Sequence, residues 1–304
     1  MKSILVTGVN SYIGNAFMDY MKQYSDGYSV EGISVRNGAW KELDFSKYDC
    51  VFDVAGIAHV DTGHVSEEAK QRYYEVNTNL AVTLAEKAKA KGVRQFIYMS
   101  SAIIYGNSAP IGEMKLITAE TVPTPADFYG DSKWQAEKGL SALADDRFHI
   151  VILRPPMIYG KNCRGNYPLL SKIARHAPVF PDYKNERSMC YIENFCEFIC
   201  RLIIKNKGGI FFPQNSGYIS TSNLVKLIAR YSGHKIFISK IFNFMRLRFV
   251  RSTMLIEEYE DYIYEKKEYF NFYKVFCKFN TYYLSCNCNF AGDNRNFLSE
   301  KLYG

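Results

Sequence analysis

The sequence predicts an α/β fold in which a doubly wound parallel sheet is followed by a smaller C-terminal lobe. Short apolar runs alternate with amphipathic stretches from residue 2 to about residue 158, a rhythm typical of a parallel sheet with helices on both faces. Hydrophobic residues make up 47% of the 304 residues, so a large core is possible. After the run "RPPMIYG" the rhythm loosens, which indicates the lobe.

The predicted elements of the sheet region follow one another in strand–helix order. Apolar runs predict strands at residues 3–8, 28–36, 50–56, 95–102 and 148–156. Helical periodicity predicts helices at residues 11–24, 77–92 and 129–144. Ligands of such sheets bind at the carboxyl ends of the strands, so the residues that follow each strand are candidates for a site.

The second half of the chain predicts helices at residues 166–178, 191–206 and 217–233. We therefore divide the chain into a sheet domain (1–160), a lobe (161–243) and a Tyr- and Phe-rich segment (244–304). The last segment has no clear strand–helix order. Two interpretations stay open for it: an irregular extension, or a translated frameshift that follows a genuine domain ending early.

Composition narrows the class of protein. The net charge of +7 comes without a long Lys/Arg run, so we expect no nucleic-acid binding, although a basic balance suits a diphosphate or nucleotide substrate. Cys277, Cys286 and Cys288 lack zinc spacing, so we expect no metal.

With no apolar run of about 20 residues and no secretory leader, we expect a reduced, cytoplasmic protein. We assign the basic, apolar stretch 240–251 to the lobe rather than to a membrane surface.

The stretch "TGVNSYIG", which follows the first predicted strand, has the form of a dinucleotide-binding turn. Gly8 allows a tight turn, and Gly14 lies on the first helical turn, where a side chain would meet the sheet. Backbone N–H groups between them, around Tyr12 and Ile13, face an anion such as a pyrophosphate. Ser11 stands where a glycine is usual, but it is small and keeps a hydroxyl donor.

Two further strand ends fit a dinucleotide. Asp44, followed by Phe45 in "LDF", stands where a carboxylate could accept a hydrogen bond from the adenine amino group. In "DVAG", the small residues Ala55 and Gly56 would let the backbone lie against the cofactor.

The end of the second strand bears on the choice between NAD and NADP. An acidic residue there would bind the ribose hydroxyls and favour NAD. Instead, Ser34 and Arg36 offer donors for a 2′-phosphate, which favours NADP.

A tyrosine and a lysine supply candidate catalytic groups. In "YGDSK", Tyr129 and Lys133 are four positions apart and share one face of a predicted helix. A free tyrosine has a pKa of about 10, and we expect a nearby ammonium and an oxidised nicotinamide to lower it. Lys133 could also hold the nicotinamide ribose. Ser100 and Ser101 end another strand, where a hydroxyl could orient the substrate hydroxyl that Tyr129 deprotonates.

In this order, the motifs resemble the extended short-chain dehydrogenases/reductases, in the branch of NAD(P)-dependent nucleotide-sugar epimerases and dehydratases. The resemblance covers about residues 2–240 and implies a Rossmann-type NAD(P)-binding domain, a substrate-binding lobe and a homodimer formed through the helix of Tyr129. It makes Ser101 the catalytic, substrate-contacting hydroxyl. It places Asn77 of "YEVNTNLAVTL" and Pro155 of "LRPPMIYG" at the cofactor, and Arg187 of "ERSMCYIENF" at the nucleotide diphosphate.

The sequence also departs from that branch. Met157 stands where many sugar epimerases have an asparagine near the substrate phosphates, and the later lobe elements are not recognisable beyond about Phe244.

Three functions are candidates for a chain with these motifs. The first is a nucleotide-sugar epimerase, UDP-hexose 4-epimerase-like, that acts through a transient 4-keto sugar. The second is an NADPH-dependent 4-ketoreductase. A 4,6-dehydratase is disfavoured, because Ala102 and Ile103 stand where it has an Asp–Glu pair. The third is a non-catalytic NAD(P)-binding regulator, against which the retained Tyr129 and Lys133 argue.

Overall fold

The structure is a computed structural model of the chain. It describes residues 1–58, 65–108, 114–244 and 253–256. The Tyr- and Phe-rich segment lies almost entirely outside the described residues, as do its three cysteines and most of the stretch 240–251. In the part of the chain that is described, no helix has the length and apolar character needed to cross a membrane.

Six parallel strands form the central sheet, in the order β10-β6-β4-β3-β1-β2. They are β1 (Lys2–Thr7), β2 (Tyr28–Ile33), β3 (Cys50–Asp53), β4 (Gln95–Met99), β6 (His149–Leu153) and β10 (Gly209–Phe211). All four residues of β3 are buried, which is the pattern of a strand covered on both faces. The predicted α/β class with a parallel sheet is confirmed.

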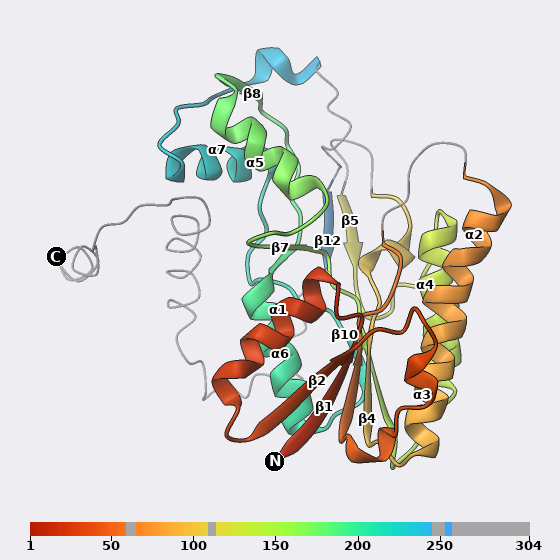
Figure 1. Ribbon diagram of the computed structural model, residues 1–304. Helices are drawn as coiled ribbons and strands as arrows, with labels where there is room; N and C mark the ends of the chain where they lie inside the picture. Colours follow the sequence, from red (N-terminus) through yellow and green to blue (C-terminus); the bar gives the residue numbers. More distant parts are fainter. Residues whose placement is uncertain (59–64, 109–113, 245–252, 257–304) are drawn as a thin grey trace.

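Helices cover both faces of this sheet (Figure 1). On one face lie α1 (Tyr12–Met21) and α6 (Ile192–Lys205). On the other lie α2 (Glu67–Tyr73), α3 (Leu80–Ala90) and α4 (Phe128–Ser141). Each layer has its own core: Phe17 and Ile199 belong to the first, and Leu84 and Leu140 to the second.

The crevice of the sheet lies between β1 and β3. The chain leaves β1 for α1 on one face, and it leaves β3 for α2 and α3 on the other. The two strands are neighbours, with Thr7 in register with Asp53, so their exits meet at the point where the winding direction changes. In open α/β sheets, ligands bind at such a switch point.

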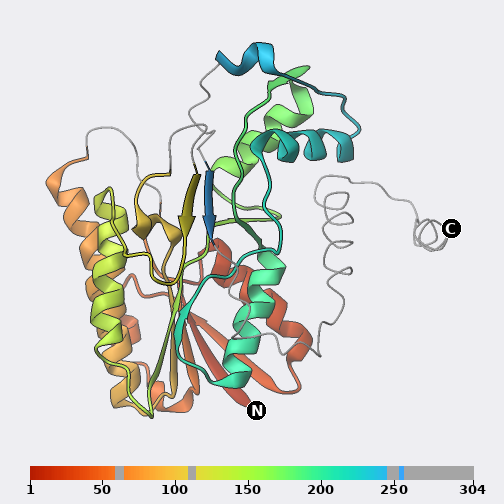
Figure 2. The same cartoon turned by 180° about the vertical axis from the view of Figure 1, so that it is seen from behind.

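The lobe lies beyond the carboxyl ends of the strands, as both views show (Figures 1 and 2). It contains α5 (Asn166–His176), α7 (Thr221–Tyr231) and the strand pair β8 (Val179–Pro181) with β11 (Phe237–Ser239). Two more short pairs lie at this end: β7 (Met157–Tyr159) with β9 (Met189–Tyr191), and β5 (Met114–Ile117) with β12 (Thr253–Ile256).

The remaining elements are single turns. They are the 3-10 helices η1 (Lys22–Tyr24), η2 (Ala39–Lys41), η3 (Phe45–Lys47), η5 (Ala102–Tyr105) and η6 (Lys240–Phe244), and the π-helix η4 (Tyr74–Asn79).

The sheet does not end where the predicted lobe begins. Helix α6 and strand β10 lie in the range 161–243, yet β10 pairs with β6 and α6 packs beside α1. The chain therefore enters the lobe, returns to complete the sheet and enters the lobe again. β10 has only three residues, too few for a strand pattern to be recognised in the sequence.

Phe17 joins α1 to the sheet and offers a test of this packing. Its ring is fully buried and meets Phe52 of β3 edge-on, with ring centroids 5.1 Å apart. We expect Phe17→Ala to lower the free energy of unfolding by about 3–5 kcal/mol, measured by urea denaturation. The control Leu169→Ala, on an exposed face of α5, should change it by less than about 1 kcal/mol. Equal losses would contradict the packing of α1 described here.

Candidate active site

Two glycines shape the turn between β1 and α1. Gly8 has φ +77° and lies so near the exit of β3 that a Cβ there would be 3.1 Å from backbone atoms of Ala55. A Cβ at Gly14 would be 3.0 Å from a methyl of Val54 and 3.1 Å from the Gly8 carbonyl oxygen. Glycines at these two positions therefore let the turn and the start of α1 pack directly against the exit of β3. The turn and the N-terminus of α1, called the cradle below, form a helix start of the kind that binds a pyrophosphate.

Ser11 caps α1. Its Oγ accepts a hydrogen bond from the Gly14 N–H at 2.9 Å, so the oxygen satisfies one of the free donors of the first turn. This bond uses the Ser11 oxygen as an acceptor, so the O–H group can still act as a donor. A contact between Ser11 and a cofactor stays a prediction.

Gly56 marks the place where three elements meet. A Cβ there would lie 3.0 Å from Asn77 Oδ1 and 3.1 Å from Lys133 Nζ. Asn77 is fully buried in the π-helix η4; its Oδ1 accepts from the Ile57 N–H at 2.8 Å, and its Nδ2 donates to Ser132 Oγ at 3.0 Å. This side chain therefore ties the exit of β3 to α4, which carries Lys133. Single π-turns of this kind occur often at functional sites.

The two predicted catalytic hydroxyls lie together. Ser101 follows β4 and Tyr129 lies in the first turn of α4, and the side chain of Ser101 is near enough to lower the pKa of Tyr129. Asp127 fixes the start of this helix, because its carboxylate accepts from the Gly130 N–H at 2.7 Å. The ring of Tyr73 packs edge-on against Tyr129, with centroids 6.1 Å apart. The phenol is thus held at the carboxyl end of the sheet with its oxygen next to a strand-end hydroxyl.

The pKa of Tyr129 differs from the expectation. Burial raises it to about 12, while the Ser101 side chain acts in the opposite direction. Lys133 Nζ donates to the Met99 carbonyl at 2.8 Å and lies 4.7 Å from the centre of the Tyr98 ring. The amine therefore has partners of its own. The protein alone keeps the phenol protonated at neutral pH, and the expected lowering of its pKa by a bound nicotinamide stays a prediction.

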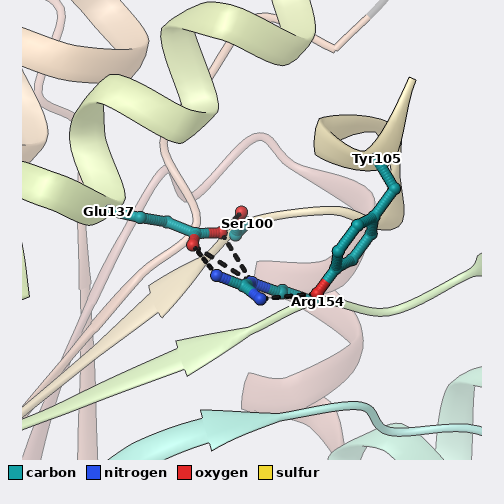
Figure 3. Close-up of polar contacts among 4 residues, drawn as sticks. All are labelled: Ser100, Tyr105, Glu137 and Arg154. Carbon is teal, nitrogen blue, oxygen red and sulfur yellow. Dashed lines mark hydrogen bonds and ion pairs between the residues drawn. The ribbon is translucent and has the colours of Figure 1, made fainter. Parts of the chain in front are cut away.

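A buried ion pair beneath the site was missed in the sequence (Figure 3). Arg154 Nη2 donates to Glu137 Oε2 at 2.5 Å, and Arg154 Nη1 donates to the Tyr105 hydroxyl at 2.5 Å. Ser100 Oγ donates to the same carboxylate. The network joins the exits of β4 and β6 to α4. Its signal was the position of Glu137, four residues after Lys133, and of Arg154, directly after an apolar strand.

The two residues predicted to lie at the adenine differ in burial: Asp44 is exposed and Phe45 is buried. Asp44 is exposed and caps η3; its carboxylate accepts from the Ser46 N–H at 3.0 Å and from Ser46 Oγ at 2.8 Å. The Phe45 ring is fully buried in the core, with Lys87 Nζ 4.9 Å from its centre. The Phe45 side chain therefore serves packing, and only its backbone is left to meet a ligand.

The remaining predicted site residues are spread over the sheet edge and the lobe. Ser34 and Arg36 follow β2, and the Arg36 side chain is exposed. The Pro155 carbonyl accepts from the Ala102 N–H at 3.0 Å, which links the exit of β6 to η5. Arg187 belongs to the lobe, where it is nearly buried and forms a backbone bridge with Ile219.

Tyr12 and Ile13, which the sequence predicts to be part of the cofactor-binding turn, have different neighbours. The Tyr12 hydroxyl lies beside Gly160, where a Cβ would approach it to 2.8 Å, and Ile13 packs against the core. Met157, the departure from the expected asparagine, lies in β7 and packs against the same core.

The comparisons with known proteins agree with this arrangement. The chain matches the NAD dependent epimerase/dehydratase family over residues 4–211. It is 30% identical over 249 residues to the UDP-glucose 4-epimerase of Vibrio cholerae, an alignment that covers 75% of each protein. The match confirms the resemblance inferred from the sequence motifs.

Two solved structures show the same fold at lower sequence identity. The UDP-glucuronic acid 4-epimerase from Bacillus cereus, in complex with NAD, has a TM-score of 0.65 at 20% identity, covering 84% of this chain and 89% of that one. The dTDP-4-dehydrorhamnose reductase from Bacillus anthracis str. Ames, in complex with NADP, also has a TM-score of 0.65, at 18% identity, covering 85% and 92%.

The close approach at Gly8 predicts a selective loss of cofactor binding. We expect Gly8→Ala to weaken the binding of NAD or NADP at least about tenfold, because its Cβ would push the turn away from Ala55. Isothermal titration calorimetry measures this. Gly92→Ala is the matched control: it also has positive φ (+79°), but no atom lies within 4 Å of its Cβ position. If the two variants bind alike, the cradle is not at Gly8.

The cap at Ser11 predicts an effect on stability rather than on binding. Ser11→Ala should lower the free energy of unfolding by about 1 kcal/mol, and Ser11→Gly by only a few tenths of a kcal/mol. Both variants lose the hydroxyl acceptor, but glycine is itself a favourable N-cap residue and alanine is not. Thermal unfolding of both variants tests this. A large loss of NADP affinity in Ser11→Gly would instead favour the hydroxyl as a phosphate donor.

Proposed function

Because the chain belongs to the NAD dependent epimerase/dehydratase family, we propose that it is a nucleotide-sugar 4-epimerase that acts through a transient 4-keto sugar. The observation that carries the proposal is that Ser101, which follows β4, and Tyr129, in the first turn of α4, lie together at the carboxyl end of the sheet. The buried Lys133 lies on the same helix as Tyr129, behind the gap left by Gly56. Such a set serves proton transfer at a sugar hydroxyl next to a nicotinamide.

The cradle at Gly8 and Gly14 would hold the pyrophosphate of NAD or NADP at the N-terminus of α1. The nicotinamide half would lie over the exposed Gly56, where its ribose hydroxyls would be near the amine of Lys133. When bound, the nicotinamide supplies reversible hydride acceptance.

In this proposal, Tyr129 and Ser101 divide the proton work. Tyr129 takes the proton of the sugar 4-hydroxyl and returns it after the ring has presented its other face. Ser101 donates a hydrogen bond to the same sugar oxygen throughout. In this proposal, a charged Lys133 would favour the phenolate of Tyr129, which burial disfavours. Arg187, in the lobe, is the candidate partner of the nucleotide diphosphate.

The residues at positions 102 and 103 favour an epimerase over a dehydratase. Eliminating water needs an acid and a base beside the reacting carbons. Ala102 and Ile103 follow Ser101 directly, Ala102 is buried, and neither side chain transfers a proton. The site therefore suits reversible oxidation at one carbon better than loss of water.

A second candidate is an NADPH-dependent 4-ketoreductase. It is favoured by the exposed Arg36 beside Ser34, which could bind a 2′-phosphate. One test separates the two functions: incubation with a panel of UDP-, GDP- and dTDP-sugars and their 4-keto forms, followed by NMR of the products. An inverted sugar without net cofactor consumption supports the epimerase. Stoichiometric loss of NADPH supports the reductase.

The role of Tyr129 gives the sharpest mutational prediction. We expect Tyr129→Phe to lower kcat for the substrate found in the panel by about 10²–10⁴-fold, since it removes the proton-transferring oxygen. The affinity for NAD should change little. Tyr74→Phe is the matched control, because its hydroxyl donates to Asp131 of the same helix at 2.8 Å. A Tyr129→Phe protein with full turnover would rule out this mechanism, and a wild-type chain that binds NAD(P) but converts no sugar would favour the regulator.

A further inference from the structure

A buried carboxyl group lies under the site, and neither the sequence motifs nor the proposed mechanism uses it. Asp53 ends β3 and is almost completely buried. Its Oδ1 accepts hydrogen bonds from Thr7 Oγ1 and, at 3.2 Å, from the Ala55 N–H. Its Oδ2 is also buried and has no hydrogen-bond partner among the residues that the structure describes. A carboxylate oxygen in this position costs free energy unless a positive charge compensates it.

The positive charge that acts on Asp53 is the amine of Lys133, and both side chains are buried. The geometry agrees, because Gly56, three residues after Asp53, is so near the amine that a Cβ there would lie 3.1 Å from Lys133 Nζ. The other groups that act on the amine or contact it are the Met99 carbonyl and the Tyr98 ring of β4, and Glu137 of α4, which pairs with Arg154 after β6. The Tyr98 hydroxyl donates to the Asn77 carbonyl at 2.9 Å, so Tyr98 is an uncharged phenol and does not balance the charge of Lys133.

The second acid, Glu137, already has its own cation. Arg154 donates to it through both Nε and Nη2, and Ser100 donates to it as well (Figure 3). Within this group of four buried charged side chains, the Arg154–Glu137 pair is therefore neutral by itself. Of the two acids that raise the pKa of Lys133, Asp53 is therefore the one that has no arginine partner among the described residues.

We propose that Asp53 is a positioning residue whose buried carboxylate keeps Lys133 in its protonated form. The carboxyl is anchored by Thr7 and Ala55 at the β1–β3 crevice, so its charge is fixed where the two strand exits meet. Burial lowers the pKa of Lys133 to about 8, and Asp53 opposes that effect. The importance of this charge for turnover rests on the proposed function, in which the ammonium favours the phenolate of Tyr129.

The test follows the amine directly and needs no substrate. Protein labelled with [ε-¹³C]lysine is titrated by NMR, and the Lys133 signal is identified by its loss in Lys133→Arg. We expect a midpoint near pH 8 in the wild type. In Asp53→Asn, the midpoint should fall by about one pH unit or more, because the charge is gone while the amide oxygen can still accept from Thr7. Asp49→Asn is the matched control: this acid pairs with Arg94 just before the same strand, and its loss should leave the midpoint unchanged.

An unchanged midpoint in Asp53→Asn would overturn the proposal, whatever reaction the chain catalyses. If this variant does not fold, [γ-¹³C]aspartate labelling of the wild type reports the charge of Asp53 itself. An ionised carboxyl at pH 7 supports the proposal, and a protonated one overturns it. Failure of the sugar panel would instead disprove the proposed function and leave both titrations valid.

Discussion

The close approach of three elements at Gly56 is the constraint on which the site depends. Even a Cβ on residue 56 would lie only 3.0 Å from the amide oxygen of Asn77 and 3.1 Å from the amine of Lys133. Asn77 is held in place by hydrogen bonds with Ile57 and Ser132. A side chain at position 56 would therefore require the ends of Asn77 and Lys133 to shift. The glycine lets both groups lie directly against the exit of β3.

The polar groups of the site are placed on rigid supports. Asp53 is the last residue of the buried strand β3, and Ser101 follows β4. Tyr129 and Lys133 lie on one helix whose start is capped by Asp127. Beneath them, the Arg154–Glu137 pair joins that helix to two strand exits. A buried pair of this kind adds little net stability, but loss of one partner costs about 3–5 kcal/mol. It therefore favours one arrangement of the strand ends over others.

Much of the fold and of the site follows from local patterns in the sequence. The alternation of apolar runs predicted the sheet, and "YGDSK" with "SSAIIYG" predicted a pair of hydroxyls that the structure brings together. Features that depend on tertiary packing did not follow. The three-residue strand β10 is recognised only by its pairing with β6, the role of Ser11 as a cap depends on where α1 begins, and the pKa of Tyr129 is set by burial. The positions of Glu137 and Arg154 in the sequence mark both residues as candidates, but only the fold brings them together. The Thr7 hydroxyl that donates to Asp53 likewise comes from another strand.

We propose that Gly56 opens onto the nicotinamide half of a dinucleotide, with Lys133 and Tyr129 against its ribose and ring. A crystal structure of the chain grown with NAD tests this arrangement most directly. We expect pyrophosphate density at the N-terminus of α1 and ribose hydroxyl oxygens within hydrogen-bonding distance of Lys133 Nζ. Dinucleotide density elsewhere on the molecule, or a ribose that does not reach Lys133, would contradict it.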